Sequence, residues 1–171
     1  FSQGIIFIVG LILARLLTPE DFGIVGIITV FIAITGAIVE GGFTEAIIQK
    51  KKVDNLDFST VFITNLSLSI LLYLLIFVFS PNIAIYFDEP QLSLLLKFAG
   101  AIIIINALCL IQHTILTIEL NFKRISIINI ASSIAGAIIA TILAFTGFGI
   151  WSLIALSILR PFFRCVLLLY H

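Results

Sequence analysis

Long apolar stretches separated by short polar breaks run along the whole chain. The stretches cover residues 1–17, 22–48, 58–79, 92–118, 125–145 and 150–170. A helix needs about 20 residues to cross a hydrocarbon core of roughly 30 Å. All stretches except the first reach that length, so the pattern predicts six transmembrane helices with a short first one.

The breaks carry signals for helix ends. Thr18 is a good N-cap, Pro19 suits the first helical position, and the acids that follow favour the positive end of the helix dipole. Pro90 opens a helix in the same way after Asp88 and Glu89. Loops this short predict antiparallel neighbours in one helical unit.

The composition indicates a membrane protein. Hydrophobic residues make up 61% of the chain and charged residues 11%, against about 45–50% and 25% in soluble domains. The net charge is zero, so no nucleic-acid partner is expected. Cys109 and Cys165 lie in apolar stretches without metal-ligand spacing, and we expect them to act only as small apolar residues. No metal or other cofactor is expected.

The start of the chain suggests a fragment. The sequence contains no methionine, including at position 1, and its first apolar stretch has neither a basic flank nor a cleavage site of the signal-peptide type. We therefore expect residues 1–171 to begin inside a first transmembrane helix.

Basic residues in the breaks are distributed asymmetrically. The breaks after the second and fourth stretches hold all five of them, whereas the breaks after the first, third and fifth hold none. By the positive-inside rule this predicts a cytoplasmic amino end in a multi-pass protein of a cytoplasmic membrane. The expected topology determinants are Lys50, Lys51, Lys52, Lys123 and Arg124.

Glu40 is the main candidate for a functional acid. If the second helix continues to residue 48, Glu40 lies roughly 15 Å inside Lys50 and near the middle of the bilayer. It shares a helix face with small residues such as Gly36, a pattern that also suits close helix packing. An acid at that depth favours a face that lines a polar cavity.

On several other helices, one face is more polar than the remaining faces. Asn65, Asn106, His113 and Asn129 lie on such faces, and interhelical hydrogen bonding is the simpler explanation for each. His113 has no second metal ligand at a suitable spacing.

Three arginines are candidates for the substrate pathway. Arg160 and Arg164 flank Pro161 in the last stretch, and two arginines near the centre would cost roughly 5–7 kcal/mol against lipid. Arg164 can alternatively reach the headgroups, whereas Arg160 favours a polar interior. Arg15 lies near an outer end, where a local ion pair with Glu20 or Asp21 is the alternative.

Several segments are similar to one transporter family. "ARLLTPEDFG", "GGFTEAIIQKK", "DEPQL", "ELNFKRISI" and "GFGIWSL" resemble the amino-terminal half of the polysaccharide transporter family, which contains O-antigen and exopolysaccharide flippases within the multidrug/oligosaccharidyl-lipid/polysaccharide exporter superfamily. The resemblance covers nearly the whole chain. The paired arginines around Pro161 are not expected from the family and rest on the physical argument alone.

The resemblance implies a fold and a function. It implies an all-α integral membrane protein whose six transmembrane helices form most of one lobe of a twelve- to fourteen-helix exporter in a bacterial or archaeal inner membrane. It implies a non-enzymatic flippase that moves undecaprenyl-pyrophosphate-linked oligosaccharide by alternating access during exopolysaccharide or lipopolysaccharide synthesis. The expected partners are this substrate, membrane lipids, a carboxy-terminal lobe and a coupling proton or sodium ion.

Other functions stay open at this point. A multidrug, cation-coupled exporter of the same superfamily would use Glu40 but not the basic last helix. A membrane enzyme acting on polyprenyl phosphates would require clustered acidic metal ligands, and the loop acids Asp54 and Asp57 are too few. In a purely structural subunit the polar faces would serve only to join helices.

Overall fold

The structure is a computed structural model that describes residues 4, 7, 9–11, 13, 15, 17–41 and 55–170, except the side chains at 40 and 55–57. Its long helices are α2 (Pro19–Glu40), α4 (Asn55–Tyr86), α5 (Pro90–Ile118), α6 (Phe122–Phe145) and α7 (Ile150–Leu169). All five are long and apolar enough to cross a membrane. The predicted all-α membrane fold is confirmed. Most of the first predicted span lies outside the described residues.

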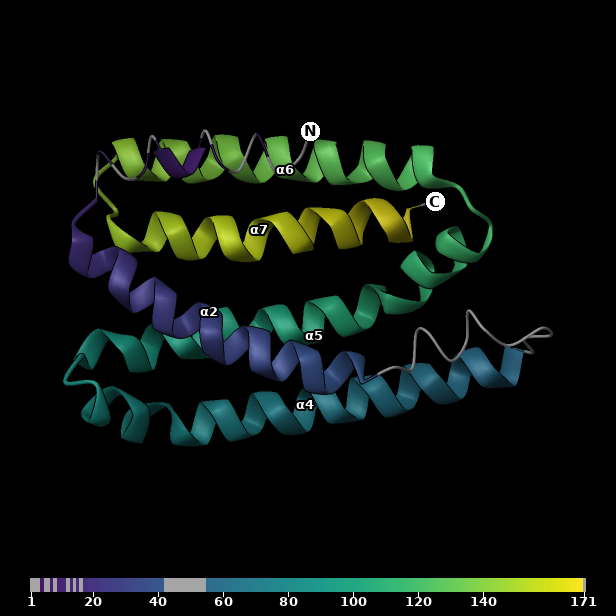
Figure 1. Cartoon of the computed structure of the whole chain (residues 1–171), viewed down its shortest axis with the longest axis horizontal. Coiled ribbons are helices and arrows are strands. Elements are labelled where there is room, and N and C mark those ends of the chain that lie inside the picture. The colour runs from purple at the N-terminus through teal and green to yellow at the C-terminus, as the bar shows by residue number, and fades with distance from the viewer. Residues whose placement is uncertain are drawn as a thin grey trace.

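Successive helices run antiparallel and pack in pairs (Figure 1). α4 packs against α5 and α6 against α7, while α5 and α7 contact each other and join the pairs. α2 crosses this group obliquely and contacts α5, α4 and α7. A main core cluster formed by leucines 92, 95 and 96 with Ile154 and Ile28 holds α5, α7 and α2 together.

The predicted helix starts agree with the structure. The Thr18 hydroxyl accepts from the Asp21 backbone N–H, and the Asp21 carboxylate accepts from the Thr18 backbone N–H at 3.0 Å. This capping box, with Pro19 in the first turn, satisfies N–H groups that an isolated helix end leaves free. Pro90 opens α5 as expected, although Glu89 occupies the N-cap position without a side-chain hydrogen bond.

Two helix ends differ from the prediction. α4 continues to Tyr86 instead of ending near residue 79, although it contains Pro81. Proline has no N–H for the Phe77 carbonyl, and the Ser80 hydroxyl donates to that carbonyl at 2.9 Å instead. α2 ends at Glu40, because Gly41 adopts a left-handed conformation (φ 32°) and closes the last turn on the Ala37 carbonyl. The predicted continuous helix to residue 48 is therefore wrong.

α6 and α7 approach closely at Gly136. A β-carbon at this position would lie 3.3 Å from the Arg160 backbone nitrogen. The polar face predicted on this helix is used for packing, because Ser133, Gly136 and Ala140 are buried and the Ser133 hydroxyl donates to its own helix at the Asn129 carbonyl. Small residues allow such close contact between helices in membranes.

The two cysteines are joined to each other. Cys109 on α5 and Cys165 on α7 form a disulfide, with Cα atoms 5.3 Å apart. Both are buried in a small apolar cluster with Ile128 and Leu168. The expectation that they act only as small apolar residues is therefore wrong, because parallel packing of α5 and α7 brings together residues 56 positions apart.

Candidate substrate-binding cavity

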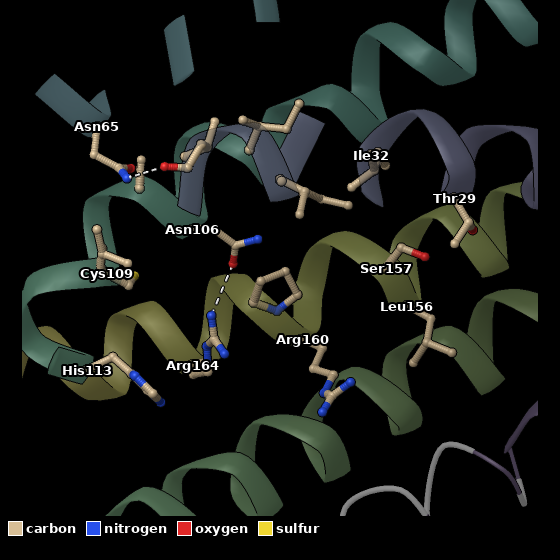
Figure 2. A pocket seen from close by; sticks show the side chains of 17 residues that line it. Thr29, Ile32, Asn65, Asn106, Cys109, His113, Leu156, Ser157, Arg160 and Arg164 are labelled. Carbon is tan, nitrogen blue, oxygen red and sulfur yellow. Dashed lines mark hydrogen bonds between the residues drawn. The ribbon is translucent and has the colours of Figure 1, made fainter. Parts of the chain in front are cut away.

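A cavity of about 560 Å³ opens between α2, α4, α5 and α7 (Figure 2). Its walls are mainly apolar, and the polar side chains among them come from all four helices. These polar residues are Thr29, Asn65, Asn106, His113, Ser157, Arg160 and Arg164. Thr29, Asn106 and Ser157 are exposed, so the cavity is open to the surface.

Arg164 and Asn106 meet across the cavity. The Arg164 guanidinium extends from α7 and its Nη2 donates to Asn106 Oδ1 on α5 at 3.1 Å (Figure 2). This bond orients the guanidinium beside the cavity. His113 lies seven residues, or about two helical turns, further along α5 and also lines the cavity.

Arg160 lies one turn before Arg164 on the same face of α7. Its guanidinium is partly buried, and its backbone packs against Gly136 of α6. Within the described part of the chain, no hydrogen bond or ion pair involves this guanidinium. The cavity wall therefore holds a second positive charge.

Asn65 joins α4 to the end of α2. Its Nδ2 donates to the Val39 carbonyl at 2.8 Å, and the residue is fully buried (0% exposed). This carbonyl belongs to the last turn of α2, where carbonyls lack partners within the helix. Asn65 is seven residues, or roughly 10 Å, inside the apolar span that begins at Phe58. Glu40, the residue after Val39, therefore has its backbone at a similar depth, while its side chain lies outside the described residues.

The cavity has the electrostatic character of an anion site. Its described lining side chains include two arginines and no carboxylate. Arginine donates parallel hydrogen bonds in a planar fork that matches phosphate or carboxylate oxygens. The arrangement can therefore bind an anionic group, while the amides and hydroxyls nearby can bind neutral polar groups.

The remaining sequence candidates lie elsewhere. Arg15 is exposed and does not line the cavity, and Asn129 accepts hydrogen bonds from Ser132 and Ser133 at its backbone oxygen on the α6 packing face. Lys123 and Arg124 are exposed at the start of α6. The lysines at 50, 51 and 52 lie outside the described residues. The structure thus brings together five candidates, namely Asn65, Asn106, His113, Arg160 and Arg164.

Two features were missed by the sequence reasoning. The disulfide was missed because the cysteines show no motif in the sequence. Lys97 was missed because it lies within an apolar stretch rather than in a break; its Nζ is 5.0 Å from the centre of the Phe77 ring, outside the cavity lining. A lone charge inside a predicted span was the available signal for Lys97.

Comparison with known proteins identifies the family. A profile of the family described as "Polysaccharide biosynthesis protein" matches residues 12–171. The chain belongs to this family. Its resemblance to polysaccharide transporters is thereby confirmed, and together with its apolar helices this makes it a multi-pass membrane protein. No solved structure matches the chain.

The curated relatives that the chain matches are longer than the chain. The chain is 31% identical over 152 residues to the succinoglycan biosynthesis transport protein ExoT of Rhizobium meliloti, covering 89% of this chain and 31% of the relative. It is 26% identical over 125 residues to the lipopolysaccharide biosynthesis protein WzxC of Escherichia coli, covering 73% of this chain and 25% of the relative. The chain thus spans less than a third of the length of these relatives.

Proposed function

We propose that this chain is one lobe of a non-enzymatic membrane flippase. The whole protein moves a pyrophosphate-linked oligosaccharide on an undecaprenyl carrier across the cytoplasmic membrane during polysaccharide synthesis, by alternating access. The observation that carries the proposal is the open cavity with Arg160 and Arg164 on one wall and no carboxylate among its described lining side chains. One relative is named for transport in succinoglycan biosynthesis, and this supports the same substrate class.

The three parts of such a substrate match the three kinds of surface in the cavity. Its pyrophosphate is anionic and pairs with the guanidinium groups of Arg160 and Arg164. Its sugar hydroxyls pair with neutral groups such as Asn106 and Ser157. Its polyprenyl tail needs only the apolar interior of the bilayer, beside apolar walls such as Ile102 and Leu156.

A second lobe completes the proposed transporter. The cavity is open on this chain, and the relatives are about three times as long as the part that matches. In exporters built from repeated halves, substrates bind near the bilayer midplane between the halves. We expect the other lobe to close the cavity and to rock against this one.

Glu40 provides the proposed coupling to protons or sodium ions. Its position follows Val39, which lines the cavity, and its backbone lies within the apolar layer. An acid at this depth is costly unless it is paired or protonated. We propose that it offsets the cavity arginines while the site is empty and takes up a proton or cation when pyrophosphate binds them.

The proposed orientation places the α5–α6 turn in the cytoplasm and the α4–α5 and α6–α7 turns outside. Lys123 and Arg124 follow the α5–α6 turn. Asp88 and Glu89 lie in the α4–α5 turn, at the opposite end of the bundle (Figure 1). Cysteines at Lys123 should react with an impermeant maleimide only from the cytoplasmic side, and cysteines at Glu89 or Phe148 only from outside. The reverse labelling pattern would refute this orientation.

Substrate class is tested by binding to the complete transporter in lipid nanodiscs. We expect saturable binding of a polyprenyl pyrophosphate, weaker binding of the monophosphate and none of the matched polyprenol, because only the first two present anionic oxygens. Tetraphenylphosphonium, a lipophilic cation, serves as the opposite probe. Binding of the cation without binding of the pyrophosphate would favour a cation exporter and would rule out the proposed substrate.

A further inference from the structure

α7 consists of two halves around Pro161. Its first half is held in the core by buried residues, including Leu153 and Ile154. Pro161 has no N–H to donate to the Ser157 carbonyl, so the helix lacks one backbone hydrogen bond at this level. Proline is a common site of helix bending for this reason. The second half, after Pro161, carries Arg164 and therefore moves this arginine if the helix bends.

Two of the contacts that tie this second half to α5 lie next to each other, beside the buried packing of Leu168 in the same apolar cluster as Leu116 of α5. One is the hydrogen bond from Arg164 to Asn106, and the other is the Cys109–Cys165 disulfide. Asn106 and Cys109 are three residues apart on α5 and share a face, and Arg164 and Cys165 are consecutive on α7. The covalent link therefore fixes the helix spacing on which the hydrogen bond depends.

We propose that the Cys109–Cys165 disulfide is a redox-sensitive clamp that holds the second half of α7, and with it Arg164, against α5 in the cavity wall. When the clamp is closed, bending at Pro161 is blocked and Arg164 stays beside Asn106. When it is open, the segment 162–169 bends and Arg164 no longer has a fixed place in the cavity.

Opening the clamp is a two-electron reduction by a dithiol. One thiolate of the dithiol attacks a sulfur of the disulfide, the other cysteine leaves as a thiolate and takes a proton, and the second dithiol sulfur displaces the first cysteine. The products are two protein thiols and the oxidised, disulfide form of the reagent. Closure is the reverse exchange with a small disulfide. Cys109 lines the cavity but is only 1% exposed, and Cys165 is 6% exposed, so a small membrane-permeant reagent is required.

The effect on binding follows from preorganisation and rests on the proposed function. A guanidinium already held in the cavity loses less freedom when it binds pyrophosphate than one on a bending segment. Each side chain that must be immobilised weakens binding by an amount equivalent to roughly threefold to tenfold in affinity. We therefore expect reduction to weaken pyrophosphate binding by about this factor.

The clamp itself is tested without substrate, in the complete transporter in nanodiscs. Peptide mass mapping after rapid alkylation should find Cys109 and Cys165 joined before treatment with a permeant dithiol and alkylated separately after it. Amide hydrogen exchange in 162–169 should then accelerate by about tenfold, while exchange in 150–158 stays unchanged. Cys109→Ser and Cys165→Ser should show the fast exchange with or without reductant. Free thiols before reduction, or unchanged exchange in 162–169 after it, would overturn the clamp.

Binding of a polyprenyl pyrophosphate separates the clamp from the proposed function. Weaker binding after reduction in the natural protein, with no reductant effect in the serine variants, supports both. Faster exchange in 162–169 without pyrophosphate binding in either redox state supports the clamp as a mechanical device and refutes the proposed substrate. Equal binding in both redox states, with unchanged exchange, overturns the clamp and leaves the proposed function standing.

Discussion

Arg164→Ala in the complete transporter is expected to weaken polyprenyl pyrophosphate binding by roughly 10- to 150-fold. Hydrogen bonds to charged groups contribute about 1.5–3 kcal/mol each, and the substitution removes the guanidinium that Asn106 orients toward the cavity. Arg164→Lys should recover only part of the affinity, because an ammonium keeps the charge but loses the planar fork.

The matched control for this substitution is Arg124→Ala. Arg124 is exposed at the start of α6, outside the cavity lining. Arg124→Ala removes the same kind of side chain and the same unit of charge as Arg164→Ala. Any change in pyrophosphate binding in this control is therefore the effect of net charge alone. Equal losses in the two variants would mean that the pyrophosphate is attracted by overall charge and that Arg164 is not a binding residue.

Glu40→Gln tests whether Glu40 and pyrophosphate compete for the cavity arginines. The variant is measured for polyprenyl pyrophosphate binding and for transport. If Glu40 offsets the cavity arginines in the empty state, removing its charge should strengthen pyrophosphate binding and flatten the pH dependence of transport. In the double variant with Arg164→Ala, the two effects should then be non-additive by more than about 0.5 kcal/mol. Additive effects together with an unchanged pH profile would leave Glu40 without a coupling role.

Spans and helix starts were predictable because their causes are local. Apolar runs of sufficient length and the Thr18–Pro19 cap lie within a few residues of the features that they determine. The end of α4 was not predictable in the same way, because Pro81 is a strong stop signal whose effect is offset by the Ser80 hydroxyl. The end of α2 depends on the left-handed conformation of Gly41 and on Asn65, which reaches Val39 from another helix.

Candidate polar faces were also predictable, but the use of each face was not. Periodicity placed Asn106 and Asn129 on comparable faces, and only the packing of the helices distinguishes them. α5 turns Asn106 toward Arg164, whereas α6 turns the Ser133–Gly136 face toward the backbone of α7. The disulfide has the same origin, since a contact across 56 residues leaves no periodic signal in the sequence.

Arg160→Met is expected to act in opposite directions on stability and binding. The Arg160 guanidinium is partly buried without a hydrogen bond or ion pair among the described residues, so its desolvation is not offset by a protein partner there. Even buried ion pairs, whose charges offset each other, have been replaced by apolar residues of similar volume with a gain in stability of about 1–4 kcal/mol. We therefore expect a higher unfolding temperature for the variant, together with at least roughly tenfold weaker binding of polyprenyl pyrophosphate.

This combination separates a functional charge from a structural one. Residues that serve binding often lower the stability of the folded protein, and substitutions that restore this stability commonly lower activity. Ser132→Ala is the matched structural control, because Ser132 is buried on α6 and bonds only to its own helix at Asn129 among the described residues. That variant should leave pyrophosphate binding unchanged. If Arg160→Met instead lowers the unfolding temperature and leaves binding intact, Arg160 serves the packing of α7 against α6, and Arg164 alone provides the anion-binding charge.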